Sequence, residues 1–145
     1  MLAIDTSAVI GFIERQDPSV VETLTSQTVE AVRSTFVEAE LLHGASAATA
    51  DSAPRRRTLG VYHQLTTLAD PPPDRATIVD LYAQVSGFAS RITNRSGQND
   101  RWIIAEAIAV NATVFVTQDA RQGDLMKRWA ESTERRITTL VCGRP

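Results

Sequence analysis

Residues 100–119 have the sequence DRWIIAEAIAVNATVFVTQD, and this stretch decides the fold. Its first half, Asp100 to Val110, is apolar around nearly its whole circumference when wound as a helix, so we expect a buried helix. Its second half, Thr113 to Thr117, is rich in β-branched residues and lacks polar alternation, which is typical of a central strand covered on both faces. A buried helix that leads into a buried strand indicates an α/β protein with a parallel sheet.

Strands and helices alternate along the rest of the chain as well. Besides the central strand, we expect strands at Met1–Ile4, Val29–Arg33, Thr66–Leu68 and Ile137–Val141. We expect a first helix that is capped by Asp5 or Thr6 and ends in Glu14 and Arg15, and further helices at residues 18–26, 35–48, 54–65, 74–93 and 120–131, with a loop or frayed helix end across residues 45–53. The sequence therefore predicts a single domain over residues 1–145, with a three-layer α/β/α fold and a central, mostly parallel sheet of four to five strands.

Composition excludes several classes of protein. The 145 residues are 43% hydrophobic and 22% charged, as in a soluble globular protein, and no apolar run is long enough to span a bilayer. The first residues form neither a basic region nor a long apolar region, so we expect no secretory signal and a cytoplasmic location. The net charge of −2 lacks the basic signature of a passive nucleic-acid binder, but it agrees with a protein whose carboxylates are offset by bound cations.

Three aspartates lie where parallel-sheet proteins carry functional residues. Asp5 follows the first strand, Asp119 follows the central strand, and Asp100 opens the buried helix. If the two strands are neighbours, Asp5 and Asp119 lie on the same rim of the sheet and can share one metal ion. Magnesium takes oxygen ligands and assists the hydrolysis of phosphodiesters. Each aspartate alone is more simply explained as a helix N-cap, so the hypothesis depends on the set.

The helix expected at residues 35–48 adds two candidate acids, Glu38 and Glu40. Both border its apolar stripe, so helical periodicity does not choose between them. Either one is also explained as a solvated residue at the edge of that stripe.

Four short motifs contain these acids. They are Ile4-Asp5-Thr6-Ser7, Glu40-Leu41-x-x-Gly44, Asp100-x-x-Ile103-x-x-x-Ala107 and Val116-Thr117-x-Asp119. In their order and spacing over almost the full chain, they resemble the PIN-domain ribonucleases, and most closely the VapC toxins of bacterial toxin–antitoxin pairs. The resemblance implies a PIN-like fold and an endoribonuclease that uses Mg²⁺, with Mn²⁺ as an alternative ion, to cleave RNA phosphodiester bonds.

The resemblance also assigns roles to individual residues. The catalytic and metal-binding acids would be Asp5, Glu40, Asp100 and Asp119. Thr6 and Thr117 would have the secondary role of orienting carboxylates or a metal-bound water. The last motif lacks the aromatic residue expected a few positions further on, and Asp124 is an extra acid there and a lower-ranked candidate. Whether Asp124 or Glu38 joins the site stays open.

Partners follow from the same resemblance. It implies an RNA substrate, a cognate VapB-like antitoxin that covers the acidic pocket, and a homodimer, with no role for a membrane. Arg95 and Arg101, in and beside the loop before the buried helix, are candidate RNA contacts. The Arg55-Arg56-Arg57 triplet is interpreted as a grip on RNA phosphates, a contact with an acidic partner or a solvated helix face. Trp102 and Trp129 are interpreted as core or interface residues rather than base-stacking platforms.

Two other functions are compatible with part of the pattern. An aspartyl-phosphate protein also has Asp after its first strand. A phosphatase of the haloacid-dehalogenase type needs a second Asp where this chain has Ser7, and a receiver domain needs a late Lys, whereas the only Lys is Lys127 inside the last helix. The remaining alternative is a catalytically inactive PIN-like module that only binds RNA or protein, and the presence of all four acids argues against it.

Overall fold

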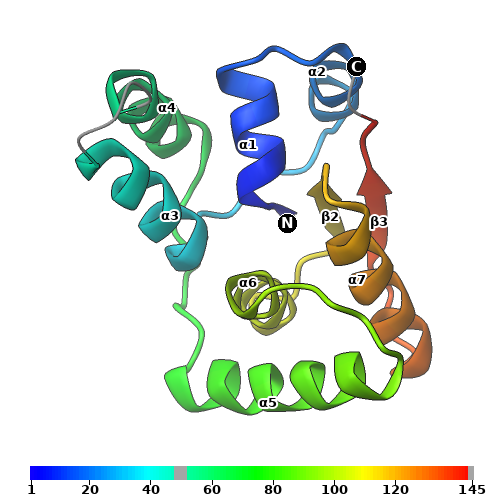
Figure 1. Cartoon of the computed structure of the whole chain (residues 1–145). Coiled ribbons are helices and arrows are strands. Elements are labelled where there is room, and N and C mark those ends of the chain that lie inside the picture. The colour runs from blue at the N-terminus through cyan, green and yellow to red at the C-terminus, as the bar shows by residue number, and fades with distance from the viewer. Residues whose placement is uncertain (48–51, 144–145) are drawn as a thin grey trace.

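The computed structural model describes residues 1–47 and 52–143 of the chain. Over these residues, seven helices surround a sheet of three strands (Figure 1). In chain order the elements are β1 (Leu2–Ile4), α1 (Thr6–Ile13), α2 (Pro18–Thr25), α3 (Thr35–Ser46), α4 (Ser52–Leu65), α5 (Arg75–Arg91), α6 (Gln98–Ala109), β2 (Val114–Thr117), α7 (Ala120–Ser132) and β3 (Thr138–Val141). Every expected helix is confirmed to within a few residues, while the part of the expected loop at residues 48–51 lies outside the described residues.

The three strands form one parallel sheet in the order β1, β2, β3. Ala3 of β1 lies opposite Phe115 of β2, which lies opposite Thr139 of β3. The predicted central strand is therefore confirmed, and β1 is its direct neighbour. Because the strands are parallel, their carboxyl ends share one edge of the sheet, so the residues that follow β1 and β2 come together there.

The expectation of four to five strands is wrong for the described residues. The segments expected to be strands at residues 29–33 and 66–68 form two isolated parallel bridges, Ala31 with Leu2 of β1 and Val32 with Thr67. The pairing of residues 29–33 does not continue, because the backbone beyond the bridges turns into α3. Ser34 caps α3, and its backbone N–H donates to the Tyr62 hydroxyl (2.8 Å). The two segments therefore extend the sheet beside β1 without becoming strands.

Helices cover both faces of the sheet, as the three-layer expectation requires. Ala3 and Phe115 point into a large core that they share mainly with α3, α5, α6 and α7. Leu2 and Val116 lie one position away on the same strands and point to the opposite face, where they pack against α1 and α2. β1 and β2 are thus buried on both sides, which explains why β2 has no polar alternation.

The buried helix that the sequence predicts is α6. All residues from Ile103 to Ile108 are buried. Trp102 stacks on Tyr82, with ring centroids 3.8 Å apart, and on Phe36, with centroids 5.4 Å apart, so it is a packing residue as expected. Although α6 is so apolar, neither it nor any other described helix is long and apolar enough to cross a membrane.

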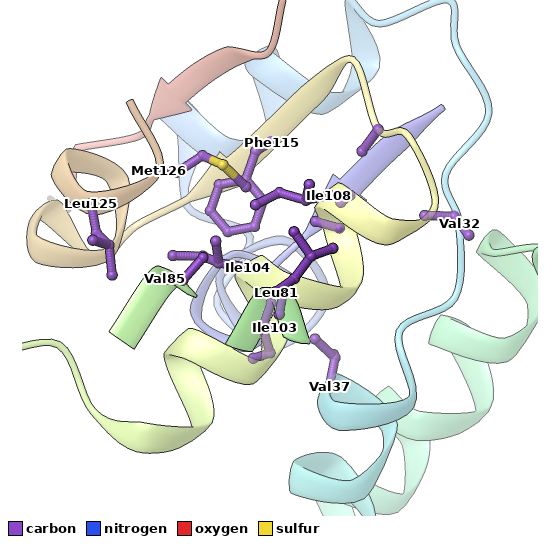
Figure 2. Packing of buried hydrophobic residues seen from close by; sticks show 14 of the residues in the cluster. Val32, Val37, Leu81, Val85, Ile103, Ile104, Ile108, Phe115, Leu125 and Met126 are labelled. Carbon is purple, nitrogen blue, oxygen red and sulfur yellow. The ribbon is translucent and has the colours of Figure 1, made fainter. Parts of the chain in front are cut away.

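Phe115 offers a direct test of this core. Its side chain is fully buried among Ile104, Ile108 and Met126 (Figure 2). The truncation Phe115→Ala leaves a cavity, so we expect the free energy of unfolding in urea to fall by about 3–5 kcal/mol. The control Leu68→Ala, at a residue that is 70% exposed, should change it by less than about 0.5 kcal/mol. Equal losses in the two variants would contradict the assigned core.

Candidate active site

A pocket of about 270 Å³ contains all four acids that the sequence singles out. They are Asp5 directly after β1, Glu40 on α3, Asp100 in the first turn of α6 and Asp119 directly before α7. The other residues that line the pocket are Thr6, Ser7, Ile10, Arg15, Ile103 and Gln122. The fold therefore brings acids that are far apart in the sequence to one place, beside the carboxyl ends of β1 and β2.

Asp5 is the most buried of the four acids, with 2% of its surface exposed. It caps α1, because its Oδ1 accepts a hydrogen bond from the Ala8 N–H (2.9 Å). The Ser7 hydroxyl also donates to this carboxylate (2.8 Å). Burial removes water from the carboxylate and raises the pKa of Asp5 to about 6, although the hydrogen bonds from Thr117, Ala8 and Ser7 lower it.

Thr117 connects two of the acids. Its hydroxyl donates to Oδ2 of Asp5 (2.5 Å) and accepts a hydrogen bond from the backbone N–H of Asp119 (2.9 Å). Asp119 in turn caps α7, since its Oδ1 accepts from the N–H of Arg121 (2.9 Å). Asp5 and Asp119 are thus both helix N-caps, which is the simpler interpretation of each residue alone. In addition, one hydroxyl joins the carboxylate of Asp5 to the backbone of Asp119.

Asp100 lies inside the first turn of α6 and not at its start, because the helix begins at Gln98. Its Oδ2 accepts a hydrogen bond from the N–H of Gly97 (3.0 Å), which closes the first turn. Burial raises the pKa of Asp100, and the negative charges of Asp119 and Glu40 raise it further, against the lowering effect of the Gly97 bond. The carboxylates are therefore close enough to repel one another.

Contacts with neighbouring helices separate Glu40 from Glu38. Oε1 of Glu40 accepts a hydrogen bond from the Thr6 hydroxyl (2.7 Å), which holds Glu40 at the pocket. Oε2 of Glu38 instead lies 2.7 Å from Nε2 of His63 on α4, and neither Glu38 nor His63 lines the pocket. Helical periodicity left this choice open because the deciding partners are on other helices.

Asp124 does not join the four acids. Half of its side chain is exposed, and its Oδ2 lies 3.7 Å from Nη1 of Arg128, one turn further along α7. The Arg55-Arg56-Arg57 triplet also lies away from the pocket lining. Nε of Arg55 donates to Glu14, the residue that follows α1 (2.8 Å), so Arg55 holds α4 against the end of α1 and is not a solvated cation.

Sequence reasoning missed Ser7 and Arg15, which both line the pocket. Ser7 had a local signal, because it lies two residues after Asp5, where its hydroxyl reaches back to the carboxylate. Arg15 had none, because its partners in the folded chain include Gln118, which is remote in sequence. Arg95 and Arg101, the expected RNA contacts, are not among the lining residues.

The donor set of the pocket fits a hard divalent cation. Each of three acids has one oxygen held by a protein donor, and its other oxygen accepts no hydrogen bond from the described residues: Oε2 of Glu40, Oδ1 of Asp100 and Oδ2 of Asp119. Within residues 1–47 and 52–143, no three acidic, His or Cys side chains lie in an arrangement that could hold a metal ion by themselves. Magnesium does not require such an arrangement, since it keeps several waters and binds through one or two carboxylates.

The PIN-domain family model matches residues 2–127 of the chain. No curated protein sequence matches the chain. The family match covers all four acids as well as β1 and β2, the strands that Asp5 and Asp119 follow.

Solved structures are similar to the chain over nearly its whole length. VapBC-1 from nontypeable Haemophilus influenzae has a TM-score of 0.70 at 18% identity, covering 97% of this chain and 96% of that one. VapBC-5 from Mycobacterium tuberculosis, a member of the VapBC family of toxin–antitoxin systems, has a TM-score of 0.64 at 23% identity, covering 96% of both chains. DNA-bound VapBC from Salmonella typhimurium has a TM-score of 0.67 at 18% identity, covering 95% of both. At these identities the likeness shows a shared fold.

The raised pKa of Asp5 makes stability depend on pH. Because its folded-state pKa of about 6 exceeds the ordinary 3.8, the folded protein binds more protons than the unfolded chain between these values. The contribution of Asp5 to stability therefore falls as the pH rises from about 4 to about 7. At about 1.4 kcal/mol per pKa unit, the expected loss is about 3 kcal/mol in the presence of a chelator.

The variant Asp5→Asn isolates this effect. It has no carboxyl group to titrate, so the difference in unfolding free energy between wild type and variant should fall by about 3 kcal/mol across the same pH range. Urea denaturation at a series of pH values measures the difference. Parallel pH profiles of the two proteins would contradict a buried, ionisable Asp5.

Proposed function

The chain belongs to the PIN-domain family, and we propose that it is a metal-dependent endoribonuclease that cleaves RNA phosphodiester bonds, the toxin of a VapBC-type toxin–antitoxin pair. One observation supports this most: four carboxylates from separate parts of the chain line a single pocket, and the Thr117 hydroxyl links the carboxylate of Asp5 to the backbone of Asp119. The four acids offer oxygen donors, which suit Mg²⁺ or Mn²⁺.

The residues of the pocket divide into ligands and supports. Asp5, Glu40, Asp100 and Asp119 would hold one or two cations. A bound cation supplies Lewis-acid chemistry, which activates water for in-line attack and neutralises charge on the phosphate. Thr117 fixes Asp5 relative to Asp119, and Thr6 fixes Glu40, so the carboxylates are oriented before substrate arrives. No side-chain nucleophile is needed.

Partners are proposed from the solved relatives, which were crystallised as VapBC complexes. We propose that residues 1–145 act as a single cytoplasmic domain, that the chain forms a homodimer, and that a VapB-like antitoxin covers the acidic pocket. Co-purification with the product of the adjacent reading frame tests the antitoxin, and loss of RNA cleavage in that complex is the expected result.

Loss of a metal-binding acid should abolish cleavage without unfolding the protein. We expect Asp5→Asn and Asp119→Asn to cut RNA in Mg²⁺ no faster than wild type does in chelator, because fewer oxygen ligands remain for the cation. The matched control is Asp124→Asn on the exposed side of α7, which should cut at the wild-type rate. Wild-type cleavage by Asp5→Asn would overturn the assignment, and a protein that binds RNA but neither cation would be the inactive binding module.

The Thr117 hydroxyl has a separate test. Thr117→Val keeps the shape of this fully buried side chain but frees Asp5 and Asp119 from their shared partner. We expect Mn²⁺ affinity, measured by calorimetry, to fall about 10- to 100-fold. Thr113→Val, at an exposed residue just before β2, should leave the affinity unchanged. Equal affinities in the two variants would show that the hydroxyl does not orient the site.

A further inference from the structure

One positively charged side chain lines the acidic pocket. Arg15 lies in the turn between α1 and α2, and it is the only Lys or Arg among the described residues of the pocket lining. Four carboxylates in one pocket repel the phosphates of an RNA strand, so a fixed cation there has a clear electrostatic consequence. The position of Arg15 is therefore of interest.

A ring of hydrogen bonds holds the Arg15 guanidinium. Its Nε donates to Oδ2 of Asp17 (3.0 Å), and its Nη2 donates to Oε1 of Gln118 (2.6 Å). The ring closes because Nε2 of Gln118 donates to the same oxygen of Asp17 (2.9 Å). Asp17 and Gln118 are 5% and 6% exposed, so the two tethers are part of the protein interior, whereas 41% of the Arg15 side chain is exposed.

The ring is connected to the proposed metal site. Gln118 lies between Thr117 and Asp119, and its backbone N–H donates to the Ser7 hydroxyl (3.0 Å), which itself donates to Asp5. Gly11 leaves room for the Gln118 side chain, since a Cβ at Gly11 would lie 2.3 Å from Oε1 of Gln118. Arg15 thus has a set position relative to the acids.

The tethers also keep Arg15 off the acids themselves. Although it shares their pocket, Arg15 forms its only ion pair in the described chain with Asp17, and none with the four carboxylates. A guanidinium has five N–H donors, of which the ring uses two. Both N–H groups of Nη1 have no partner among the described residues. The remaining donors suit a phosphate, whose oxygens match the planar fork of Arg.

We infer that Arg15 binds a backbone phosphate of the RNA strand next to the one that is cleaved, with Asp17 and Gln118 as positioning residues. This inference rests on the proposed ribonuclease function. A phosphate contact fixes the register of the strand and carries no base information, so Arg15 raises affinity for RNA of any sequence.

Binding of RNA by a non-cleaving protein tests the contact. In the Asp5→Asn background, Arg15→Gln should bind a short single-stranded RNA about 10- to 100-fold more weakly. The slope of log K against log salt concentration should become shallower by about 0.7, as for one lost contact to a single strand. Arg15→Lys keeps the charge but not the fork and should recover part of the affinity. The matched control is Arg75→Gln, which removes the same charge from an exposed position at the start of α5.

Neutral linkages identify the phosphate. The probe is an RNA in which one phosphate at a time is replaced by an uncharged methylphosphonate. In the protein that has Arg15, neutralising one particular linkage should weaken RNA binding more than neutralising any other. In Arg15→Gln, neutralising that same linkage should no longer weaken binding. An unchanged pattern of penalties, or equal binding by Arg15→Gln and Arg75→Gln, would overturn the inference. An Arg15 that instead binds an acidic partner protein would give this negative result.

Cleavage by the otherwise wild-type protein separates this inference from the proposed function. If the wild type cuts RNA in Mg²⁺, Arg15→Gln should raise KM while kcat stays within about threefold, because the contact is made in both the bound and transition states. If Arg15→Gln cuts RNA with the KM of the wild type, this inference is wrong and the proposed function still stands. A wild-type protein that neither cuts nor binds RNA overturns the proposed function and this inference with it.

Discussion

The Thr117 hydroxyl, placed between Asp5 and the backbone of Asp119, is the contact on which the site depends. It exists because β1 and β2 are parallel neighbours in one register, with Ile4 opposite Val116, so that the next residues of both strands meet at one edge. That register is in turn specified by burial on both faces of the sheet, because a shift by one residue would exchange the two packed faces. The packing of the core therefore also determines the geometry of the site.

The pocket concentrates negative charge, and the fold offsets part of the electrostatic cost locally. Asp5 and Asp119 cap α1 and α7, where the backbone N–H groups and the helix dipole favour a carboxylate. Asp5 still has a raised pKa, because removal of water outweighs its hydrogen bonds. The same residues thus serve as caps in the free protein and as candidate ligands for a cation, and the two roles use different oxygens in Asp119.

Features specified by local sequence were predictable, and features that depend on remote partners were not. The apolar strand β2, the buried helix α6 and the acids beside them follow from periodicity and turn chemistry. The choice of Glu40 over Glu38 depends on Thr6 and His63, on other helices. Two expected strands form only isolated bridges, and the one at residues 29–33 ends where the chain turns to cap α3. The position of Arg15 in the pocket was not predictable, because its hydrogen bond to Gln118 joins residues that are far apart in the sequence.

The pairing of the first strand with β2 has a consequence for biosynthesis. β1 leaves the ribosome before its partner strand, Val114–Thr117, which is made only after α1 to α6. Contacts of such high sequence separation form late and slowly. Asp5 cannot meet Thr117 and Asp119 until those residues have emerged. A nascent or prematurely terminated product that stops before β2 would carry Asp5 and Glu40 without Thr117 and Asp119, so the four-acid pocket forms only after β2 and the residues that follow it have been made.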